Sequence, residues 1–411
     1  MAEEDGILIR SLKSQILDLP PSCVEFCPAH PSYFLVGTYS LEQSENTVEA
    51  NADGDSDSDA EDAKPAQPKQ PQSRNGSIIA FQLLDGTLTR VQTVPQPSAL
   101  LDLRFNPHEG YGDICAVVSS TATLALFRLC PEENHPLKHL HTMDIKTLSQ
   151  GKIEPSPGEE ILFLSFGWHP TRADLMVITT STGHVYLAHL PAFDKDWTLT
   201  PEPVITHTLE TWCAVISPVP AGPDQSDGNT QFRVYSGGDD SMLRFRTCDW
   251  ADGELTASLP ATQARGHDAG VTAILPLFAQ EDSHELVVTG SYDENIRLFS
   301  VPPYGRPVCL AESGLGGGVW RLKLMDLETK KDDLHSSWRA RILASCMHAG
   351  TRVVELLKKD GEYQVRVLAR FEEHKSMNYG SDFQPGWRDR LSVVSTSFYD
   401  KLLCFWEVEL A

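Results

Sequence analysis

The stretch VVTGSYDENIRLF, residues 287–299, opens with an apolar run, turns at a small polar cluster and leaves through alternating apolar residues. Two extended runs around a tight turn are typical of a β-hairpin. The same pattern recurs in five other segments: residues 115–127, 176–188, 234–246, 342–354 and 394–406. A seventh copy is divided, because FLVGTYS (34–40) enters the turn and NGSIIAF (75–81) leaves it. The chain therefore repeats one hairpin unit.

A further strand is predicted upstream of the hairpins, often closed by an aromatic residue and proline, as in VEFCP, LRFNP and SFGWHP. Three to four strands per repeated unit form a propeller blade. RGHDAGV (265–271) adds the Gly-His pair of a WD repeat. We predict an all-β, seven-bladed WD-repeat β-propeller as a single domain over residues 1–411. The N-terminal GILIRSL (6–12) is predicted to form the outer strand of the last blade and so close the ring.

The turn residues that align the six undivided copies are Thr121, Thr182, Asp240, Asp293, His348 and Asp400. In a WD blade the turn aspartate, the Gly-His histidine, a strand Ser or Thr and a final tryptophan form a buried hydrogen-bond chain. We therefore expect His267 with Asp293, and Asp400 with Trp406, to have structural roles. Arg246 stands where the corresponding tryptophan of its blade is expected, which predicts a looser blade there.

Composition and charge limit the partners of this protein. The formal net charge of −23 argues against a nucleic-acid backbone, which requires a basic surface. No apolar run is long enough to span a bilayer, and the first residues are acidic, so we expect a cytoplasmic protein that does not enter membranes. Residues 41–74, acidic and then rich in Pro and Gln, are predicted to be a disordered loop in the first blade. We expect a monomer without a metal site or cofactor, with reduced cysteines.

Several segments are more particular than a general WD blade: TGSYDE (289–294), GGVWRLK (317–323), SCMHAG (345–350), SFYDKLLCFWE (397–407), ETW (210–212), VGTYSL (36–41) and YGSDF (379–383). Together they resemble the eukaryotic diphthine methylesterases, WD-repeat proteins of the diphthamide pathway. The resemblance implies an esterase without a cofactor that acts on translation elongation factor 2. In that reaction a methyl ester beside a trimethylammonium group is hydrolysed on a modified histidine, and methanol is released.

Such a substrate requires a site for a permanent cation. Quaternary ammonium groups bind the faces of aromatic rings. The segments that carry the resemblance supply Trp212, Tyr292, Trp320, Tyr379 and Tyr399, from separate blades and at positions expected to face the central mouth. We predict that they form an aromatic cage, although each could instead pack in the core. Glu210, Asp239 and Asp382 are expected to add negative potential.

Ester hydrolysis also requires a base and a donor for the developing oxyanion. His348 is the candidate base, with water as the nucleophile; the alternative is that it replaces a turn aspartate in the buried network. Cys346 is a second candidate nucleophile, although a buried inert thiol is also consistent with its position. Arg321, or a backbone N–H near Gly317 and Gly318, is the candidate oxyanion donor. The GLGGGVW glycines (314–320) are otherwise expected to let the chain turn closely into an inner strand.

A different class of function is also compatible with the fold, because most propellers are binding platforms. A non-enzymatic WD-repeat adaptor, such as the substrate receptor of a ubiquitin ligase, is the alternative to the esterase. Receptors of that kind often carry W-D-x-R at the ends of blades, and this sequence has no such motif.

Overall fold

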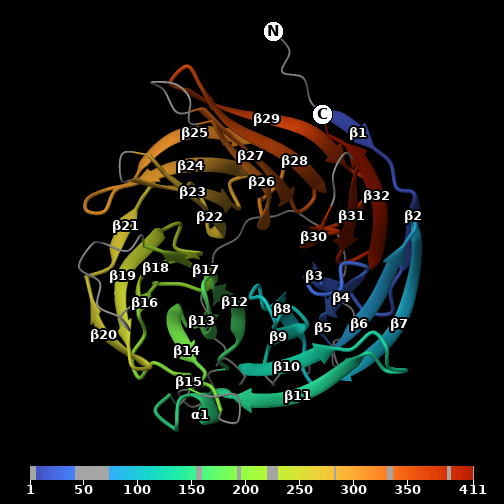
Figure 1. The fold of residues 1–411 in the computed structure, drawn as a ribbon, viewed down its shortest axis with the longest axis horizontal. Coiled ribbons are helices and arrows are strands. Elements are labelled where there is room, and N and C mark those ends of the chain that lie inside the picture. The colour runs from blue at the N-terminus through green and yellow to red at the C-terminus, as the bar shows by residue number, and fades with distance from the viewer. Residues whose placement is uncertain are drawn as a thin grey trace, which may run out of the picture.

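Seven β-sheets of four or five strands surround a central axis in the computed structural model, as the blades of a propeller (Figure 1). The structure describes residues 6–41, 74–153, 160–191, 196–219, 230–281, 284–330, 337–386 and 390–410. The predicted all-β, seven-bladed β-propeller is confirmed. The described part of the chain contains one helical turn, α1 (Ile145–Leu148), and the side chain of its N-cap residue Asp144 accepts a hydrogen bond from the Thr147 backbone N–H.

Each blade is a meander that starts at the axis and runs outward. The strands of the first four blades, from the inside outward, are β3 (Pro21–Phe26), β4 (Tyr33–Thr38), β6 (Arg74–Leu84) and β7 (Thr87–Gln96), with β5 (Ser40–Leu41) beside β6; β8 (Leu100–Phe105), β9 (Ile114–Ser119), β10 (Thr123–Leu129) and β11 (Leu137–Asp144); β12 (Phe163–His169), β13 (Arg172–Thr180), β14 (His184–His189), β15 (Thr198–Leu199) and β16 (Ile205–Thr206); and β17 (Thr211–Pro218), β18 (Thr230–Gly238), β19 (Leu243–Ala251), β20 (Glu254–Ser258) and β21 (Thr262–Ala264).

The last three blades follow the same order. Their strands are β22 (Val271–Glu281), β23 (His284–Ser291), β24 (Asn295–Val301) and β25 (Val308–Gly314); β26 (Arg321–Lys330), β27 (Ser337–Ser345), β28 (Thr351–Lys359) and β29 (Glu362–Phe371); and β30 (Gly380–Phe383), β31 (Arg390–Ser397) and β32 (Leu402–Glu409). The hairpins found in the sequence are the pairs formed by the second and third strands of each blade, such as β23 with β24.

The apolar pattern follows the position of a strand within its blade. The second strands are buried along almost their whole length, as in β9, because each blade is covered by a neighbour on both faces. Outer strands such as β7 alternate between half-buried and exposed residues, because only one of their faces is covered. The core therefore lies between blades and not inside any single sheet.

The N-terminal segment 6–12 pairs with a different blade from the one predicted. The segment 6–12 contains β1 (Ile7–Ile9), which pairs in parallel with β29 at the outer edge of the sixth blade. The residues that follow form β2 (Lys13–Ile16), which pairs antiparallel with β32 and completes the seventh blade. An N-terminal strand does close the ring, as Figure 1 shows, but the chain contributes to two blades before it enters the first.

The insertion in the first blade leaves from paired strands. Leu41 of β5 lies opposite Arg74 of β6, so the two ends of the insertion are held together. The predicted disorder of residues 41–74 concerns mainly residues 42–73, which lie outside the described residues.

The expected buried hydrogen bonds are formed only in part. Histidine bonds to a strand Ser or Thr, but His267 Nδ1 and His374 Nδ1 have no partner among the described residues, and the turn aspartates Asp293 and Asp400 bond to other groups. In the seventh blade His374 Nε2 lies 2.8 Å from Ser395 Oγ, which also accepts a bond from Trp406 Nε1 at 3.0 Å. In the fifth blade His267 Nε2 lies 2.8 Å from Thr289 Oγ1. In the fourth blade Arg246, in place of tryptophan, donates to the carbonyls of Val204 and Leu259, both at 2.7 Å. Arg246 therefore bonds both within its own blade, to Leu259, and to the third blade, at Val204 beside β16.

The contribution of the Trp406 hydrogen bond to stability can be measured by comparison with Trp250. Trp250 is similarly buried, but its Nε1 has no partner among the described residues. Trp406→Phe and Trp250→Phe remove the same volume, but only the first removes a hydrogen bond. We expect the free energy of unfolding to fall by about 1 kcal/mol more for Trp406→Phe. Denaturant titration of both variants measures this difference, and equal losses would mean that the bond adds no stability.

β-Bulges direct one side chain from each of four blades into the central cavity. In five blades the register of the inner strand shifts around its second residue, as between Thr211 and Cys213. A bulge inserts an unpaired residue and turns its side chain. Four of the five bulged residues line the central cavity: Leu101, Leu164, Trp212 and Thr272. The repeated bulge thus adds these four side chains to the lining of the cavity.

Candidate functional site

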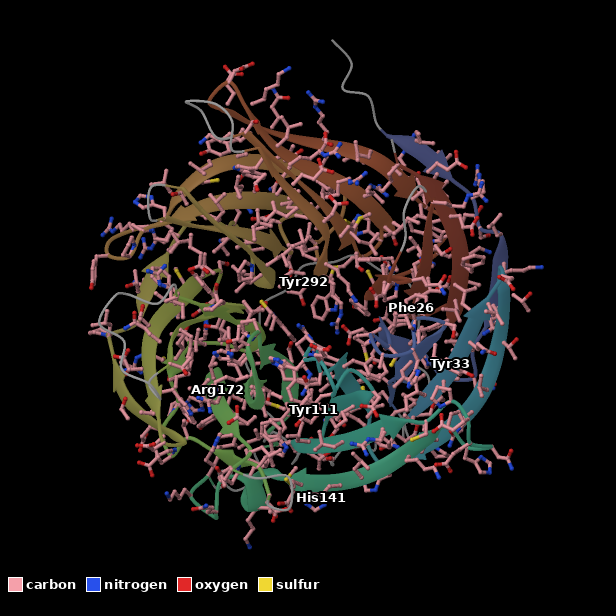
Figure 2. All side chains as sticks on the ribbon, in the orientation of Figure 1. Phe26, Tyr33, Tyr111, His141, Arg172 and Tyr292 are labelled. Atoms are coloured by element: carbon pink, nitrogen blue, oxygen red, sulfur yellow. The ribbon has the colours of Figure 1, made fainter. Side chains whose placement is uncertain are left out.

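Aromatic side chains from four blades meet at one mouth of the central channel. The ring centroid of Trp320 lies 5.9 Å from Trp212, 5.9 Å from Tyr292 and 5.0 Å from Tyr379. Trp212 and Tyr292 also meet edge to face, with centroids 6.1 Å apart. Tyr292 is seen beside the central opening in Figure 2. Four of the five aromatic residues predicted from the sequence therefore form one continuous cluster, which we call the mouth cluster.

The mouth cluster extends further than the sequence predicted. Phe398 packs against Tyr379 at 5.4 Å and links it to the fifth predicted residue, Tyr399, whose ring lies 5.0 Å from Phe398. Tyr39 of the first blade also contacts Phe398, at 6.0 Å. Sequence reasoning gave no role to Phe398 or Tyr39, although both lie in segments that carried the resemblance. Tyr399 is 69% exposed and marks the outer end of this row of rings.

Acidic groups lie beside the rings. Asp239 Oδ1 accepts a hydrogen bond from Trp212 Nε1 at 3.0 Å, and the Asp239 backbone N–H donates to the carbonyl of Glu210. Burial raises the pKa of the Tyr292 hydroxyl, and Tyr379, Asp239 and Glu210 raise it further. The phenol is therefore neutral at cellular pH. Asp239 and Glu210 thus lie close enough to act on the Tyr292 hydroxyl, and Asp239 also orients the Trp212 ring.

The GLGGG segment fits closely against the turn that carries His348. A Cβ atom on Gly317 would lie 2.4 Å from the carbonyl oxygen of Cys346, and Gly316 has a φ of +83°. Only glycine adopts this path without displacing the neighbouring backbone. The segment leads directly into Trp320 and the inner strand β26, as expected from the sequence, and so places Trp320 at the mouth.

A cavity of about 190 Å³ lies in the channel and is shared by aromatic and charged side chains. Trp212 and Trp320 line it together with an ionic cluster from the inner strands, which we call the channel cluster. The charged members that line the cavity are Glu25, Arg104, Arg321, Lys323 and Asp382. Asp102, directly bonded to two of them, is the sixth charged member.

One part of the channel cluster is built around Asp102. Arg321 Nη1 reaches across the channel from the sixth blade to Asp102 of the second, at 2.8 Å. Arg104 Nε lies 3.1 Å from the same carboxylate, and Ser165 Oγ donates to it at 2.8 Å. Burial alone would raise the pKa of Asp102, but Arg104, Arg321 and Ser165 outweigh it and lower that pKa. This part holds one carboxylate and two guanidinium groups, so it is electropositive.

The other part is built around Lys323, which lies two residues after Arg321 on β26. Lys323 Nζ lies 2.6 Å from Asp382 Oδ1 and 3.5 Å from Glu25 Oε1. Asp382 Oδ2 also accepts from the backbone N–H of Phe26, at 2.7 Å. Asp382 is buried and its charge is met by Lys323, so it lies below the mouth and not among the rings. This part holds two carboxylates and one ammonium group.

The sequence carried a signal for the channel cluster that was not used. Glu25 is a charged residue within the otherwise apolar stretch VEFCP, and Asp102 and Arg104 are charged residues spaced by two in the next inner strand, LLDLRF. Arg321 and Lys323 are spaced by two, so their side chains lie on one side of β26. Which of these charges meet across the ring depends on closure of the propeller.

His348 does not occupy the position of Asp293. Residues 292–294 join β23 to β24, whereas the longer segment 346–350 joins β27 to β28. The His348 side chain is 57% exposed, and its Nε2 lies 3.9 Å from Glu294 Oε1. The interpretation that His348 replaces an aspartate in the buried network is therefore wrong. It lies at the surface beside the fifth blade, outside the residues that line the central cavity.

Cys346 lies in the core between the fifth and sixth blades. Its side chain is fully buried, and burial raises its pKa to about 12. A thiol with this pKa carries almost no thiolate at cellular pH, and only the thiolate is nucleophilic. The position counts against Cys346 as the nucleophile. Arg321, in contrast, lines the central cavity next to Trp320.

The described residues contain no group of three or more His, Cys, Asp or Glu side chains arranged to hold a metal ion. None of their helices has the length and apolar character needed to cross a membrane.

The sequence is similar over nearly its whole length to curated proteins named diphthine methyltransferase. The relative from Schizosaccharomyces pombe is 25% identical over 98% of this chain and 99% of its own. The Saccharomyces cerevisiae relative is 24% identical over 95% and 96%, and the human relative is 26% identical over 91% and 74%. No protein-family model matches the sequence. These relatives confirm the resemblance expected from the sequence, although their names describe methyl transfer and the resemblance implies ester hydrolysis.

Proposed function

We propose that this protein is a diphthine-modifying enzyme of diphthamide biosynthesis that hydrolyses the methyl ester of methylated diphthine on translation elongation factor 2. The mouth cluster carries the proposal: four rings connected through Trp320, with the carboxylates of Asp239 and Glu210 close by, suit a trimethylammonium group. The similarity to proteins named for diphthine supports the same substrate class. We expect the protein to act as a cytoplasmic monomer on the factor.

The charged cavity below the rings supports hydrolysis. An ester carbonyl beside a cation held at the mouth would lie next to Arg321, which follows Trp320 in the chain and lines the same cavity. A guanidinium group held by Asp102 is suited to stabilise the oxyanion that forms when water attacks the carbonyl. The net negative charge of the chain favours capture of a cationic substrate, because opposite charges attract at long range.

The reaction is tested with purified protein and elongation factor 2 that carries a methyl-labelled ester beside the trimethylammonium group. We expect labelled methanol to be released without any added methyl donor. Transfer of label from a methyl donor to unesterified factor, without methanol release from the esterified factor, would overturn the proposal in favour of methyl transfer. Tight binding of the factor without either reaction would instead support the adaptor.

A further inference from the structure

Two carboxyl groups of the channel cluster differ in their surroundings. Asp102 is held by Arg104, Arg321 and Ser165, which lower its pKa and make it a weak base. Glu25 has fewer stabilising contacts: Lys323 Nζ at 3.5 Å and the backbone N–H of Phe105 at 2.5 Å. Two groups whose pKa values are driven apart in one site often have different catalytic roles.

The contacts of Lys323 leave Glu25 as the more loosely held member of its pair. Lys323 Nζ is closer to Asp382, at 2.6 Å, than to Glu25, at 3.5 Å. The Glu25 side chain is 22% exposed and lines the cavity, so water reaches it, whereas Asp382 is buried. Burial raises the pKa of Glu25; Asp382 adds to this, and Lys323 opposes it. A carboxylate in such a setting is a stronger base than an ordinary glutamate.

We propose that Glu25 is the general base of the ester hydrolysis, with Arg321 as the oxyanion donor. This inference rests on the proposed function. The Glu25 carboxylate takes a proton from a water molecule in the cavity as the water oxygen bonds to the ester carbonyl carbon. The carbonyl oxygen becomes negative and is held by Arg321. When the intermediate collapses, the bond between the carbonyl carbon and the methoxy oxygen breaks, and the leaving oxygen takes the proton from Glu25. Ester and water become acid and methanol, and Glu25 is again a carboxylate.

His348 is the competing base, and its position separates the two hypotheses. Glu25 lines the same cavity as Trp320 and Arg321, so ring, oxyanion donor and base surround one space. His348 is at the surface next to Glu294 and does not line that cavity. A base must reach the attacking water while the substrate is bound. The shared cavity favours Glu25.

The decisive variants are Glu25→Gln, His348→Ala and a matched control, Glu285→Gln. Glu285 is also a carboxylate in an inter-blade ion pair, with Arg233 at 3.3 Å, and it accepts hydrogen bonds from Ser217 and Tyr235, but it is not among the residues that line the central cavity. We expect Glu25→Gln to lower kcat for methanol release by about 10²–10⁴-fold with little change in KM. His348→Ala and Glu285→Gln should keep near wild-type kcat. An active Glu25→Gln protein, or a comparable loss of kcat in His348→Ala, would overturn the assignment.

Stability measurements distinguish this role from a purely structural one. A folded pKa above the unfolded value means that stability from Glu25 is present at low pH and is lost as pH rises through the folded pKa. Glu25→Gln should therefore leave the Tm near pH 8 unchanged or raised, whereas Glu285→Gln should lower it. A Glu25→Gln protein that loses stability together with activity would indicate that Glu25 only holds the ring together.

The pH profile adds a readout that a structural role would not move. Wild-type kcat should fall on the acid side as Glu25 becomes protonated, with this limb above the ordinary range of a glutamate. The charges of Lys323, Asp382 and Arg104 affect the pKa of Glu25. Glu25 in turn affects the pKa values of Arg321, Cys27 and Cys115. An acid limb of the kcat profile at the ordinary pKa of histidine that disappears in His348→Ala would contradict the proposal.

Failure of the wild-type protein to release methanol would refute the proposed function itself, whereas failure of Glu25→Gln alone to lose activity refutes only this inference.

Discussion

Arg321→Met should lower kcat for ester hydrolysis by about 10²–10³-fold, the usual loss when a single oxyanion donor is removed. Methionine keeps most of the length of the side chain and removes the donors. KM should change less than kcat, because the ester in its ground state carries no full charge for Arg321 to hold. Turnover under saturating substrate measures the effect directly.

The stability of the Arg321→Met protein should fall only moderately. Asp102 would lose the contact at 2.8 Å but would keep Arg104 at 3.1 Å and the hydroxyl of Ser165 at 2.8 Å. A carboxylate that retains partners avoids most of the penalty of an unpaired buried charge. Arg341→Met is the matched control, because Arg341 forms a similar ion pair with Asp326, at 2.7 Å, in the same blade but outside the channel.

The control distinguishes a catalytic role of Arg321 from a purely structural one. If Arg321→Met and Arg341→Met both lose stability but only Arg321→Met loses kcat, Arg321 acts on the reacting group. If Arg321→Met keeps its kcat, the arginine serves only to join the sixth and second blades. Arg321→Lys should recover part of kcat, because it restores a positive charge without the planar fork of donors.

Trp320→Ala should weaken binding of the trimethylated substrate by about 2 kcal/mol, or roughly 30-fold in Kd, at the upper end for one cation–π contact. Trp320 contacts three other rings of the mouth cluster, so its loss also removes the support of its neighbours. Trp320→Phe, which keeps an aromatic face, should lose much less. The intrinsic fluorescence of the tryptophans at the mouth provides a direct titration signal.

A neutral substrate analogue makes this prediction specific. Replacing trimethylammonium by a tert-butyl group preserves shape and removes the charge, so wild-type protein should bind the analogue more weakly. Trp320→Ala should bind the two ligands with more nearly equal affinity. An equal loss for the charged and neutral ligands would mean that Trp320 provides only packing. Tyr399→Ala, at the exposed outer end of the row, should have a smaller effect on both Kd and Tm.

The local pattern of the chain was enough to predict the blades. A hairpin requires only period-2 apolar runs around a turn, and both are contained within about a dozen residues. The segments 287–299 and 394–406 could therefore be placed in their blades, and the aromatic residues at their turns could be assigned to one mouth. The mouth cluster was predictable in outline because equivalent positions in successive blades face the same end of the ring.

Only the tertiary structure decided the contacts between strands that are far apart in the sequence. The bond between Arg321 and Asp102 joins the sixth blade to the second, and the approach of Lys323 to Glu25 joins the sixth to the first. No local pattern specifies these partners, because they meet only after the N-terminal strands β1 and β2 have closed the ring. The alternative that His348 belongs to the buried network was wrong for a related reason. The turn that carries His348 has two more residues than the turn of Asp293, and an alignment of hairpin patterns does not reveal them. The longer turn places the His348 side chain in solvent.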